Sequence, residues 1–228
     1  MAIYTHNAEY FNTLDSPDKA YWVGFLLADG GVYKGQLWLN LSKKDRVQLE
    51  NFRKSITSSH PIKEKTTHVM FYIRSKLFVD SLTQYGITER KTFSTKLPKQ
   101  IPEPYMKDFI RGYFDGDGCI TYNKKRNTKV FSLTGTFELL DAIQNILVTK
   151  LKLPKNKLQV QKNSFTLAYG GNHQVTKIFE YLYNNSSLYL ERKRNRFIEL
   201  EMLVERNRGR IGRPKGAKDK QQRKRRIT

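Results

Sequence analysis

The sequence is poor in the residues that build disulfide-bonded and zinc-stabilised proteins. Its 228 residues include a single cysteine, Cys119, which excludes an internal disulfide and any cysteine-rich zinc module. The four histidines, His6, His60, His68 and His173, are scattered without the spacing of metal ligands. We therefore expect no catalytic site built on histidine.

Long apolar segments are also absent. No N-terminal run resembles a signal peptide, and no segment approaches the ~18 apolar residues of a membrane span. These absences predict an intracellular, cytoplasmic protein that is soluble and has no membrane partner. Hydrophobic residues still make up 38% of the chain and aromatic residues 12%. That content argues against disorder for most of the chain, and the length suits one or two domains with a real core.

Acidic residues are scarce beside basic ones, at 21 Asp and Glu against 42 Lys and Arg, for a net charge of +21. Residues 206–228 alone hold eleven Lys or Arg and one acid, Asp219, which gives +10. A basic body with a basic tail predicts a polyanionic partner and binding that weakens in salt. A membrane surface is the other option, but the tail lacks the apolar face of an interfacial helix. A solvated charge run that only aids solubility is the alternative interpretation of the tail.

A nine-residue pattern occurs twice in this chain. Residues 22–30, WVGFLLADG, return 88 positions later as residues 110–118, IRGYFDGDG. Each copy is a short apolar run that ends in an acid followed by glycine. Small residues stand four apart in both copies, and positions four apart share one face of a helix. Such faces let two helix backbones approach closely.

Close packing of the two runs would set their C-terminal ends side by side, with Asp29 next to Asp117. Two carboxylates at close range repel each other and need a cation between them. In a chain of this charge, the pair predicts a metal site for cutting nucleic acid. A single Asp-Gly after a helix is usually a cap or a turn, and the repetition argues against that interpretation here.

The flanking segments repeat in the same order as the motif. Each motif is followed by strand-like and amphipathic helix-like runs in alternation, at 37–41, 47–56, 69–73 and 78–85 and again at 131–134, 137–147, 158–161, 165–169 and 175–182. Glu-Arg-Lys closes both units, at residues 89–91 and 191–193. Internal repetition of this kind predicts an α+β fold of two pseudo-symmetric αββαββα units.

Composition also suggests the boundaries of these units. We expect a first unit at residues 1–90, a polar linker with two prolines at 91–103 and a second unit at 104–205. The second unit should end in a helix that begins near Leu190. The tail, 206–228, is rich in glycine and charge, and we expect it to be disordered alone.

The paired motifs resemble those of the LAGLIDADG homing endonucleases, in the single-chain form with two motifs. The resemblance covers residues 10–205 and includes the segments Asp108–Gly118, Leu133–Thr136 and Leu190–Lys193. It implies that the motif helices form the interface between two halves, each with an antiparallel sheet that serves as a saddle for duplex DNA. It also implies a site-specific, metal-dependent double-strand DNA endonuclease that recognises a long asymmetric target as a monomer.

By the same resemblance, Asp29 and Asp117 are metal ligands, and the carbonyls of Ala28 and Gly116 are further ligands. Mg²⁺ (or Mn²⁺) is the expected cofactor, since hard cations prefer oxygen ligands and keep several waters. Such an ion activates water and stabilises charge at the attacked phosphate. The chain begins at Met1 and ends without a terminal His-Asn, so we expect a freestanding protein rather than one embedded in an intein.

A basic side chain near the cleaved phosphate would stabilise developing charge. Lys91 and Lys193 occupy equivalent places at the ends of the two units, and Lys43 follows a strand end. We predict catalytic roles for these three lysines, with an ordinary surface charge as the alternative for each. Asp115 has Leu27 as its first-motif counterpart, so we expect a solvated or helix-end acid there. We expect Cys119 to be a small buried strand residue.

DNA recognition is predicted for the polar faces of the strands. Alternate side chains of a strand point to opposite faces, so the leucines of residues 36–42 should pack on helices and the other residues should face DNA. Gln, Asn and Arg suit base edges in the major groove, whereas a basic hairpin positions the phosphates. Ordinary solvent-facing residues are the alternative for part of this set. The predicted DNA-binding residues of the two units are Gln36, Trp38, Asn40, Ser42, His68, Tyr72, Arg74, Lys124, Lys125, Arg126, Gln159, Gln161 and Thr166.

The tail carries one further pattern. Residues 212–216, GRPKG, resemble the core of a minor-groove AT-hook, so Arg213 and Lys215 join the predicted DNA-binding residues.

Two alternatives to the endonuclease remain on the same fold: a maturase that binds intron RNA, and a catalytically inactive DNA-binding regulator. The presence of both Asp29 and Asp117 disfavours the inactive version.

Overall fold

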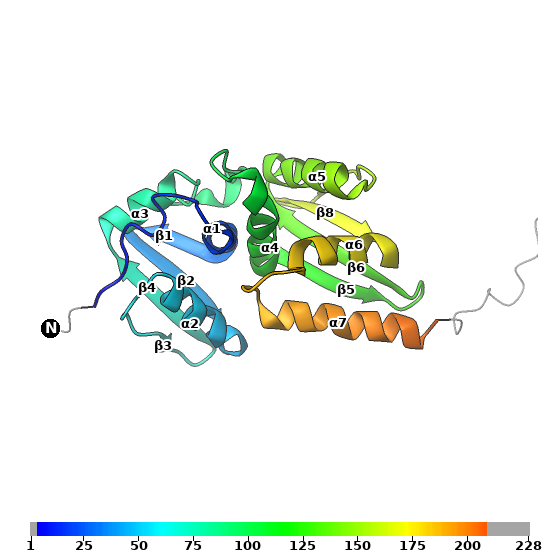
Figure 1. Ribbon diagram of the computed structural model, residues 1–228, viewed down its shortest axis with the longest axis horizontal. Coiled ribbons are helices and arrows are strands. Elements are labelled where there is room, and N and C mark those ends of the chain that lie inside the picture. Colours follow the sequence, from blue (N-terminus) through cyan, green and yellow to red (C-terminus); the bar gives the residue numbers. More distant parts are fainter. Residues whose placement is uncertain (1–3, 209–228) are drawn as a thin grey trace, which may run out of the picture.

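The computed structural model describes residues 4–208 and shows two halves of the same architecture side by side (Figure 1). The first half contains α1 (Pro17–Asp29), β1 (Gly30–Tyr33), β2 (Gln36–Ser42), η1 (Lys43–Asp45), α2 (Arg46–Ser55), β3 (Lys63–Glu64), β4 (His68–Arg74) and α3 (Lys76–Thr83). The second contains α4 (Met106–Asp117), β5 (Gly118–Asn123), β6 (Thr128–Gly135), α5 (Phe137–Leu151), β7 (Gln159–Val160), β8 (Phe165–Gly170), α6 (Asn172–Tyr183) and α7 (Glu191–Arg206). The short helical turns η2 (Lys91–Phe93) and η3 (Glu103–Tyr105) lie between them.

Each half forms one four-stranded antiparallel sheet, in the order β1-β2-β4-β3 in the first half and β5-β6-β8-β7 in the second. The order of elements through α3 and through α6 is αββαββα in both halves, and α7 is an addition to the second. The predicted α+β fold of two repeated units is confirmed.

Local sequence accounts for where the motif helices begin and end. Ser16 caps α1 by accepting a hydrogen bond from the Lys19 amide at 3.3 Å, and the Pro17 that follows suits the first helical position. Both helices stop at the glycine after the acid. A Cβ atom at Gly30 would lie 2.6 Å from the Leu26 carbonyl oxygen, and one at Gly118 would lie 2.5 Å from that of Phe114. Only glycine lets the chain turn so tightly from helix to strand.

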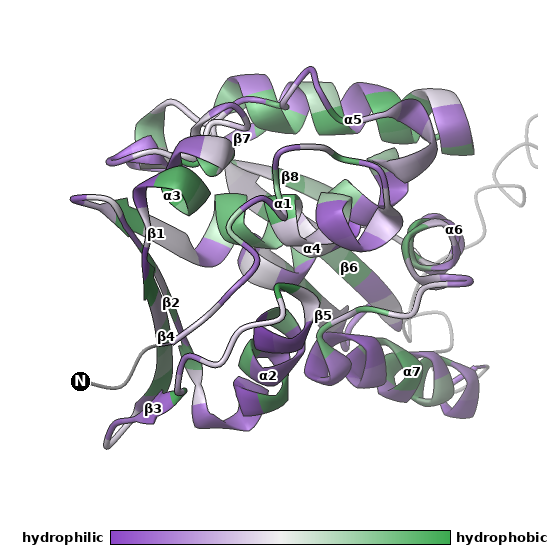
Figure 2. Ribbon diagram, turned by 60° about the vertical axis from the view of Figure 1, so that its left-hand side comes forward, coloured by the Kyte–Doolittle hydropathy of each residue, from purple (hydrophilic) through white to green (hydrophobic). Residues whose placement is uncertain are grey.

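The sheets are covered by helices on one face. Leu37, Leu39 and Leu41 of β2 are buried, while the residues between them are exposed or half-buried, as the alternation predicts. Figure 2 shows the first sheet nearly edge-on, with α1, α2 and α3 all on one side of it. Within residues 4–208, the helices therefore leave the outer face of the first sheet available to a partner.

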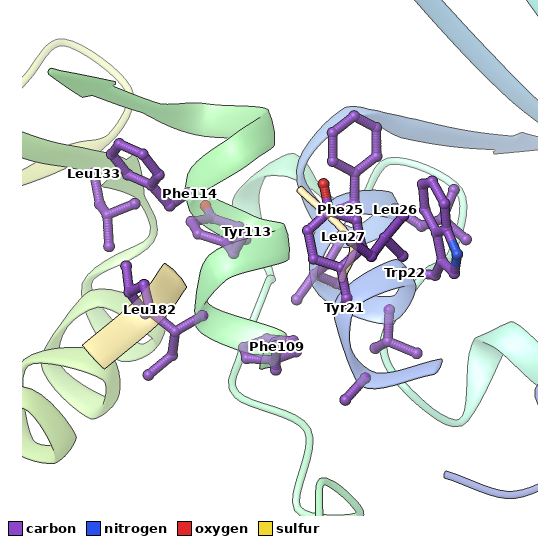
Figure 3. Close-up of a cluster of buried hydrophobic side chains, with 14 of the residues drawn as sticks. Tyr21, Trp22, Phe25, Leu26, Leu27, Phe109, Tyr113, Phe114, Leu133 and Leu182 are labelled. Atoms are coloured by element: carbon purple, nitrogen blue, oxygen red, sulfur yellow. The ribbon is translucent and has the colours of Figure 1, made fainter. Parts of the chain in front are cut away.

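The two halves meet along α1 and α4, whose buried aromatic side chains gather around the contact (Figure 3). Between the halves, Lys91, Thr95 and Ile101 are buried, so the segment predicted as a linker packs against the body of the protein. The predicted unit boundaries remain a proposal. Arg213 and Lys215 lie outside the described residues. Within residues 4–208, no helix is long and apolar enough to cross a membrane.

Candidate metal and nucleic-acid site

Two glycines bring the motif helices into backbone contact. A Cβ atom at Gly24 would lie 2.1 Å from the Phe109 carbonyl oxygen, and one at Gly112 would lie 2.0 Å from that of Tyr21. One helical turn later, a Cβ atom at Gly116 would lie 2.3 Å from the Cβ of Ala28. Side chains larger than hydrogen at these glycines would push the helices apart, so the small residues four apart set the distance between the helix ends.

The close packing places the two motif acids beside each other. The same hypothetical Cβ at Gly116 would lie 3.5 Å from Oδ2 of Asp29, so the carboxylate of the first half reaches the second motif. Both acids are open to solvent, yet the protein around them reduces their hydration. This desolvation raises the pKa of Asp29 to about 6, and the negative charge of Asp117 adds to the shift. Desolvation also raises the pKa of Asp117, against the opposing charges of Lys91 and Lys193.

Two buried lysines flank the acids. Lys91 donates to the Ala28 carbonyl at 3.2 Å, and Lys193 donates to the Gly116 carbonyl at 3.1 Å. Lys193 makes two further bonds, to the carbonyls of Phe114 at 2.5 Å and Gly118 at 2.6 Å. Burial lowers the pKa of Lys193 to about 8 and also lowers the pKa of Lys91. The two carbonyls predicted as metal ligands are thus the ones that the two predicted catalytic lysines already contact.

Lys43, the third predicted catalytic lysine, has a different partner. Its Nζ forms an exposed ion pair with Glu64 at 2.9 Å, and neither motif acid is among its partners in the described part of the chain. Residues 4–208 also contain no group of three or more His, Cys, Asp or Glu side chains arranged to hold a metal ion. Any cation at this site would therefore rely on two carboxylates, with main-chain carbonyls and non-protein oxygens completing its ligands.

Beside Asp117 and Lys91 lies a pocket of about 340 Å³. Its other walls come from both halves and from the segment between them, namely Leu27, Ala28, Phe93, Thr95, Tyr113, Thr134, Gly135, Asn163 and Ser164. The Tyr113 hydroxyl donates to the Thr134 carbonyl at 2.8 Å, and desolvation and the nearby Asp117 raise its pKa. Sequence reasoning missed Tyr113, although its place inside the repeated motif was a usable signal.

Of the two alternatives expected for Asp115, a solvated acid is wrong, and the residue lies in the last turn of α4. The side chain is 1% exposed and accepts hydrogen bonds from the Tyr21 hydroxyl at 2.9 Å, the Tyr183 hydroxyl at 2.6 Å and the Leu190 amide at 2.7 Å. Three donors from distant segments replace the water that a solvated acid would need. Burial raises the pKa of Asp115. Asp115 therefore ties α1 and α6 to α4 behind the motif acids.

Cys119 lies in a strand, β5, as expected, but the prediction that it is buried was wrong, because it is exposed on the outer face of that strand. It pairs with Ser132, whereas its neighbour Ile120 is the residue that points into the core.

A contact between α7 and the first half was not predicted from the sequence. Arg192 binds buried Asp45 through two hydrogen bonds, at 3.1 and 3.0 Å, and so joins α7 to the first half.

The predicted DNA-binding residues of the first half share one surface. Register pairs Gln36 with Arg74, Trp38 with Tyr72 and Ser42 with His68, which puts these residues on the outer face of the sheet. Asn40, between Trp38 and Ser42 by alternation, is exposed on the same face.

The corresponding surface of the second half holds fewer of the predicted residues. Gln159 pairs with Thr166, so both lie on one face, and Gln161 begins the turn that connects β7 to β8. Lys124, Lys125 and Arg126 are exposed in the hairpin between β5 and β6, as predicted. The binding roles of all these residues stay predictions.

Comparison with known proteins bears on this geometry. Residues 104–192 match the family described as LAGLIDADG-like domain. The replication factor C small subunit of Methanocaldococcus jannaschii is 24% identical over 198 residues, which are 83% of this chain and 10% of that protein. The DNA-directed RNA polymerase subunit Rpo1C of the same organism is 27% identical over 204 residues, 82% of this chain and 21% of that protein. The chain thus spans only a small part of the length of these curated relatives.

Solved structures match over nearly the whole fold. The LAGLIDADG meganuclease I-AabMI bound to uncleaved DNA aligns with a TM-score of 0.59 and 13% identity, over 86% of this chain and 92% of that chain. The I-LtrWI homing endonuclease bound to target DNA gives 0.58 and 13%, over 89% and 92%. I-SmaMI bound to uncleaved DNA with calcium ions gives 0.55 and 14%, over 86% and 94%. The resemblance in the sequence is therefore confirmed: residues 104–192 are similar to the LAGLIDADG-like domain, and the single chain with both motifs shares its fold with these LAGLIDADG endonuclease structures.

Proposed function

We propose that this protein is a site-specific, metal-dependent endonuclease that cuts both strands of a long asymmetric DNA target as a monomer. The observation that carries the proposal is the pair Asp29 and Asp117, which lie beside each other at the ends of α1 and α4. In the described residues, the outer positions of the neighbouring strands β2 and β6 are exposed or half-buried. The solved relatives of this fold are described as bound to uncleaved or cleaved DNA, one of them with calcium ions.

The donor set suits a divalent cation. Desolvation raises the pKa of both carboxylates, and the charge of Asp117 adds to the shift of Asp29. A positive ion between the two acids would stabilise their charged forms. Oxygen ligands alone favour a hard ion such as Mg²⁺ or Mn²⁺. When bound, the ion would supply an activated water and charge stabilisation at the phosphate. Asp29 and Asp117 would hold it, with the carbonyls of Ala28 and Gly116 as the further candidates.

The lysines would act on both the main chain and the substrate. Lys91 and Lys193 hold the carbonyls of Ala28 and Gly116 in place, and their positive charges offset the repulsion between the acids. A backbone phosphate brought to the acids would lie near the same two ammonium groups. Their buried charge would stabilise the negative charge that develops on it during cleavage.

The rest of the surface would hold the duplex. The outer faces of the sheets would contact base edges, and the basic hairpin Lys124–Arg126 would contact phosphate. In the tail, Arg213 and Lys215 would add minor-groove contacts. Because the two halves differ in sequence at most outer-face positions, one monomer would require an asymmetric target.

The test is cleavage of a randomised duplex library by the purified protein with Mg²⁺, followed by sequencing of the cut ends. Asp29→Asn and Asp117→Asn should each lower cutting at the selected target by at least ~100-fold, because each removes a ligand. Binding of the intact duplex should persist in both variants. Asp80→Asn, an exposed acid on α3, is the matched control and should cut normally. Normal cutting by Asp29→Asn or Asp117→Asn would refute the metal-ligand role.

Two other outcomes separate the alternatives. Binding to a defined duplex without cutting in Mg²⁺ or Mn²⁺ would favour an inactive DNA-binding regulator. Absence of duplex binding, with tight binding to a structured intron RNA, would favour a maturase.

A further inference from the structure

The strands of the two sheets pair in the same register, so their outer faces can be compared position by position. The glycine after each motif acid pairs with a leucine of the next strand, Gly30 with Leu39 and Gly118 with Leu133. Each leucine then pairs with a buried residue of the next strand in the sheet. Leu39 pairs with Phe71 of β4, and Leu133 pairs with Leu167 of β8. Since alternate residues face opposite sides, these pairs fix which outer-face residues correspond.

The outer face of the first sheet carries large aromatic and polar side chains, Tyr33, Gln36, Trp38, Asn40, Tyr72 and Arg74. Trp38 and Tyr72 are cross-strand partners whose rings stack with centroids 5.2 Å apart at an interplanar angle of 22°. Lys63 donates to the Tyr72 hydroxyl at 3.0 Å, and its Nζ lies 4.8 Å from the centre of that ring. The centre of this face is thus a pre-arranged aromatic surface with a cation at its edge.

The outer face of the second sheet is different at every one of these positions. The six counterparts, in the same order, are Thr121, Val130, Ser132, Thr134, Ala168 and Gly170. None of these side chains extends beyond the γ position, and a Cβ atom built at Gly170 would meet no heavy atom within 4 Å. In place of the stacked pair, this face has a serine opposite an alanine.

We infer that base-specific recognition is concentrated on the half of the target that lies under the first sheet, and that the Trp38–Tyr72 pair selects thymine there. This inference rests on the proposed DNA-cutting function. Long Gln, Asn and Arg side chains reach base edges and bond them in a directional way, and the thymine methyl group is the apolar feature of the major groove. Aromatic faces at the centre of the reading surface therefore match thymine.

The second sheet contributes differently. Its six short residues extend too little to pair with base edges, which leaves Gln159, opposite Thr166 on the edge strand β7, as a polar side chain long enough to reach a base. The adjoining hairpin offers Lys124, Lys125 and Arg126, which suit phosphate. Contacts to phosphate fix the position of a duplex and carry no sequence information. The half of the target under the second sheet is thus bound with tolerance for its sequence.

The experiment first locates each half of the target. Cys119 is the only cysteine of the chain and is exposed on the outer face of the second sheet. An iron–EDTA reagent attached to it would cut the DNA backbone nearby and so identify the half-site under that sheet. Cys119→Ser treated with the same reagent is the control for unattached reagent.

The second step measures recognition without cleavage. Full-length protein is used in Ca²⁺ to select duplexes from a library randomised across both half-sites. We expect most of the base preference in the half-site that the Cys119 reagent does not cut. In that half, replacing one preferred thymine by deoxyuridine, which lacks the methyl group, should weaken binding by about fivefold to tenfold. Trp38→Ala should bind thymine and deoxyuridine targets equally.

Matched variants separate this recognition from simple surface contact. Ser132→Ala occupies the position that corresponds to Trp38 and should leave the selected sequences unchanged. Equal base preference in both half-sites, or a thymine preference that survives in Trp38→Ala and in Tyr72→Ala, would overturn the inference while leaving the endonuclease proposal in place. Failure of the wild-type protein to bind any duplex would overturn both.

Discussion

The ends of α1 and α4 are alike in their main-chain contacts and unlike in what surrounds them. Each helix ends in an acid, and the carbonyl before each acid accepts a bond from a buried lysine. Lys91 contacts one carbonyl, however, whereas Lys193 contacts three. Each motif helix has a glycine that lies against the main chain of the other helix, so a larger residue in either helix would disturb the packing of both. The surroundings differ because Lys91 comes from the short turn η2, whereas Lys193 comes from the first turn of α7.

The strongest test of the mutual contact is to enlarge its two glycines. Gly24→Leu and Gly112→Leu should each lower the free energy of unfolding by more than about 3 kcal/mol, because the new side chain collides with main-chain atoms of the other helix. Denaturant unfolding measures the loss. Gly170→Ala, whose Cβ would meet nothing within 4 Å, is the control. A large effect for only one motif glycine would contradict the equivalence of the two sides.

Asp115, whose counterpart in the first motif is Leu27, should have the next largest effect when it is replaced. Asp115→Leu should lower the free energy of unfolding by about 3 kcal/mol, because two hydroxyls and one amide lose their acceptor. Asp115→Asn keeps one side-chain carbonyl oxygen as an acceptor and should lower the free energy of unfolding by less. A neutral result for Asp115→Leu in thermal unfolding would mean that these donors find other partners.

The lysines should separate stability from activity. Lys193→Met should lower the free energy of unfolding by roughly 1–2 kcal/mol, since three carbonyls lose a donor, and Lys91→Met should lower it by less. Both variants should slow cleavage by at least ~10-fold. Unfolding curves and single-turnover cleavage, measured on the same preparations, check the two effects. The opposite order in stability would show that the number of carbonyl contacts does not distinguish the lysines.

The smallest effect should come from the pH dependence of Asp29. Its pKa rises from 3.8 to about 6 on folding, so between these values the folded protein binds a proton that the unfolded chain has released. Stability without metal should therefore fall as pH rises from about 4 to about 6, by roughly 1 kcal/mol after allowance for solvent screening. Melting temperatures in EDTA should show this slope in the wild type, and Asp29→Asn should lose most of it. A slope of the opposite sign would contradict the desolvation of Asp29.

The features that the sequence predicted are those written in short-range patterns. Spacing of small residues predicted the helix contact, and alternation in β2 predicted the buried leucines. The features that were missed depend on partners far along the chain. Asp115 is buried by Tyr183, 68 residues away, and Asp45 binds Arg192, 147 residues away. The residues next to Asp115 and Asp45 in the sequence do not indicate these long-range contacts. Cys119 differs, because Ile120 beside it was a local sign that the cysteine faces outward.

The contact between α1 and α4 also fixes when the acid pair can exist during synthesis. The two helices carry motifs that lie 88 residues apart in the sequence. Their contact is therefore non-local and follows local folding of each half. Lys193, which anchors the second motif through three carbonyls, leaves the ribosome later still. A growing chain therefore exposes Asp29 before Asp117 has been made, and it contains both acids before Lys193 is available to hold the second motif. The acid pair with both of its lysines is complete only after residue 193 has been made.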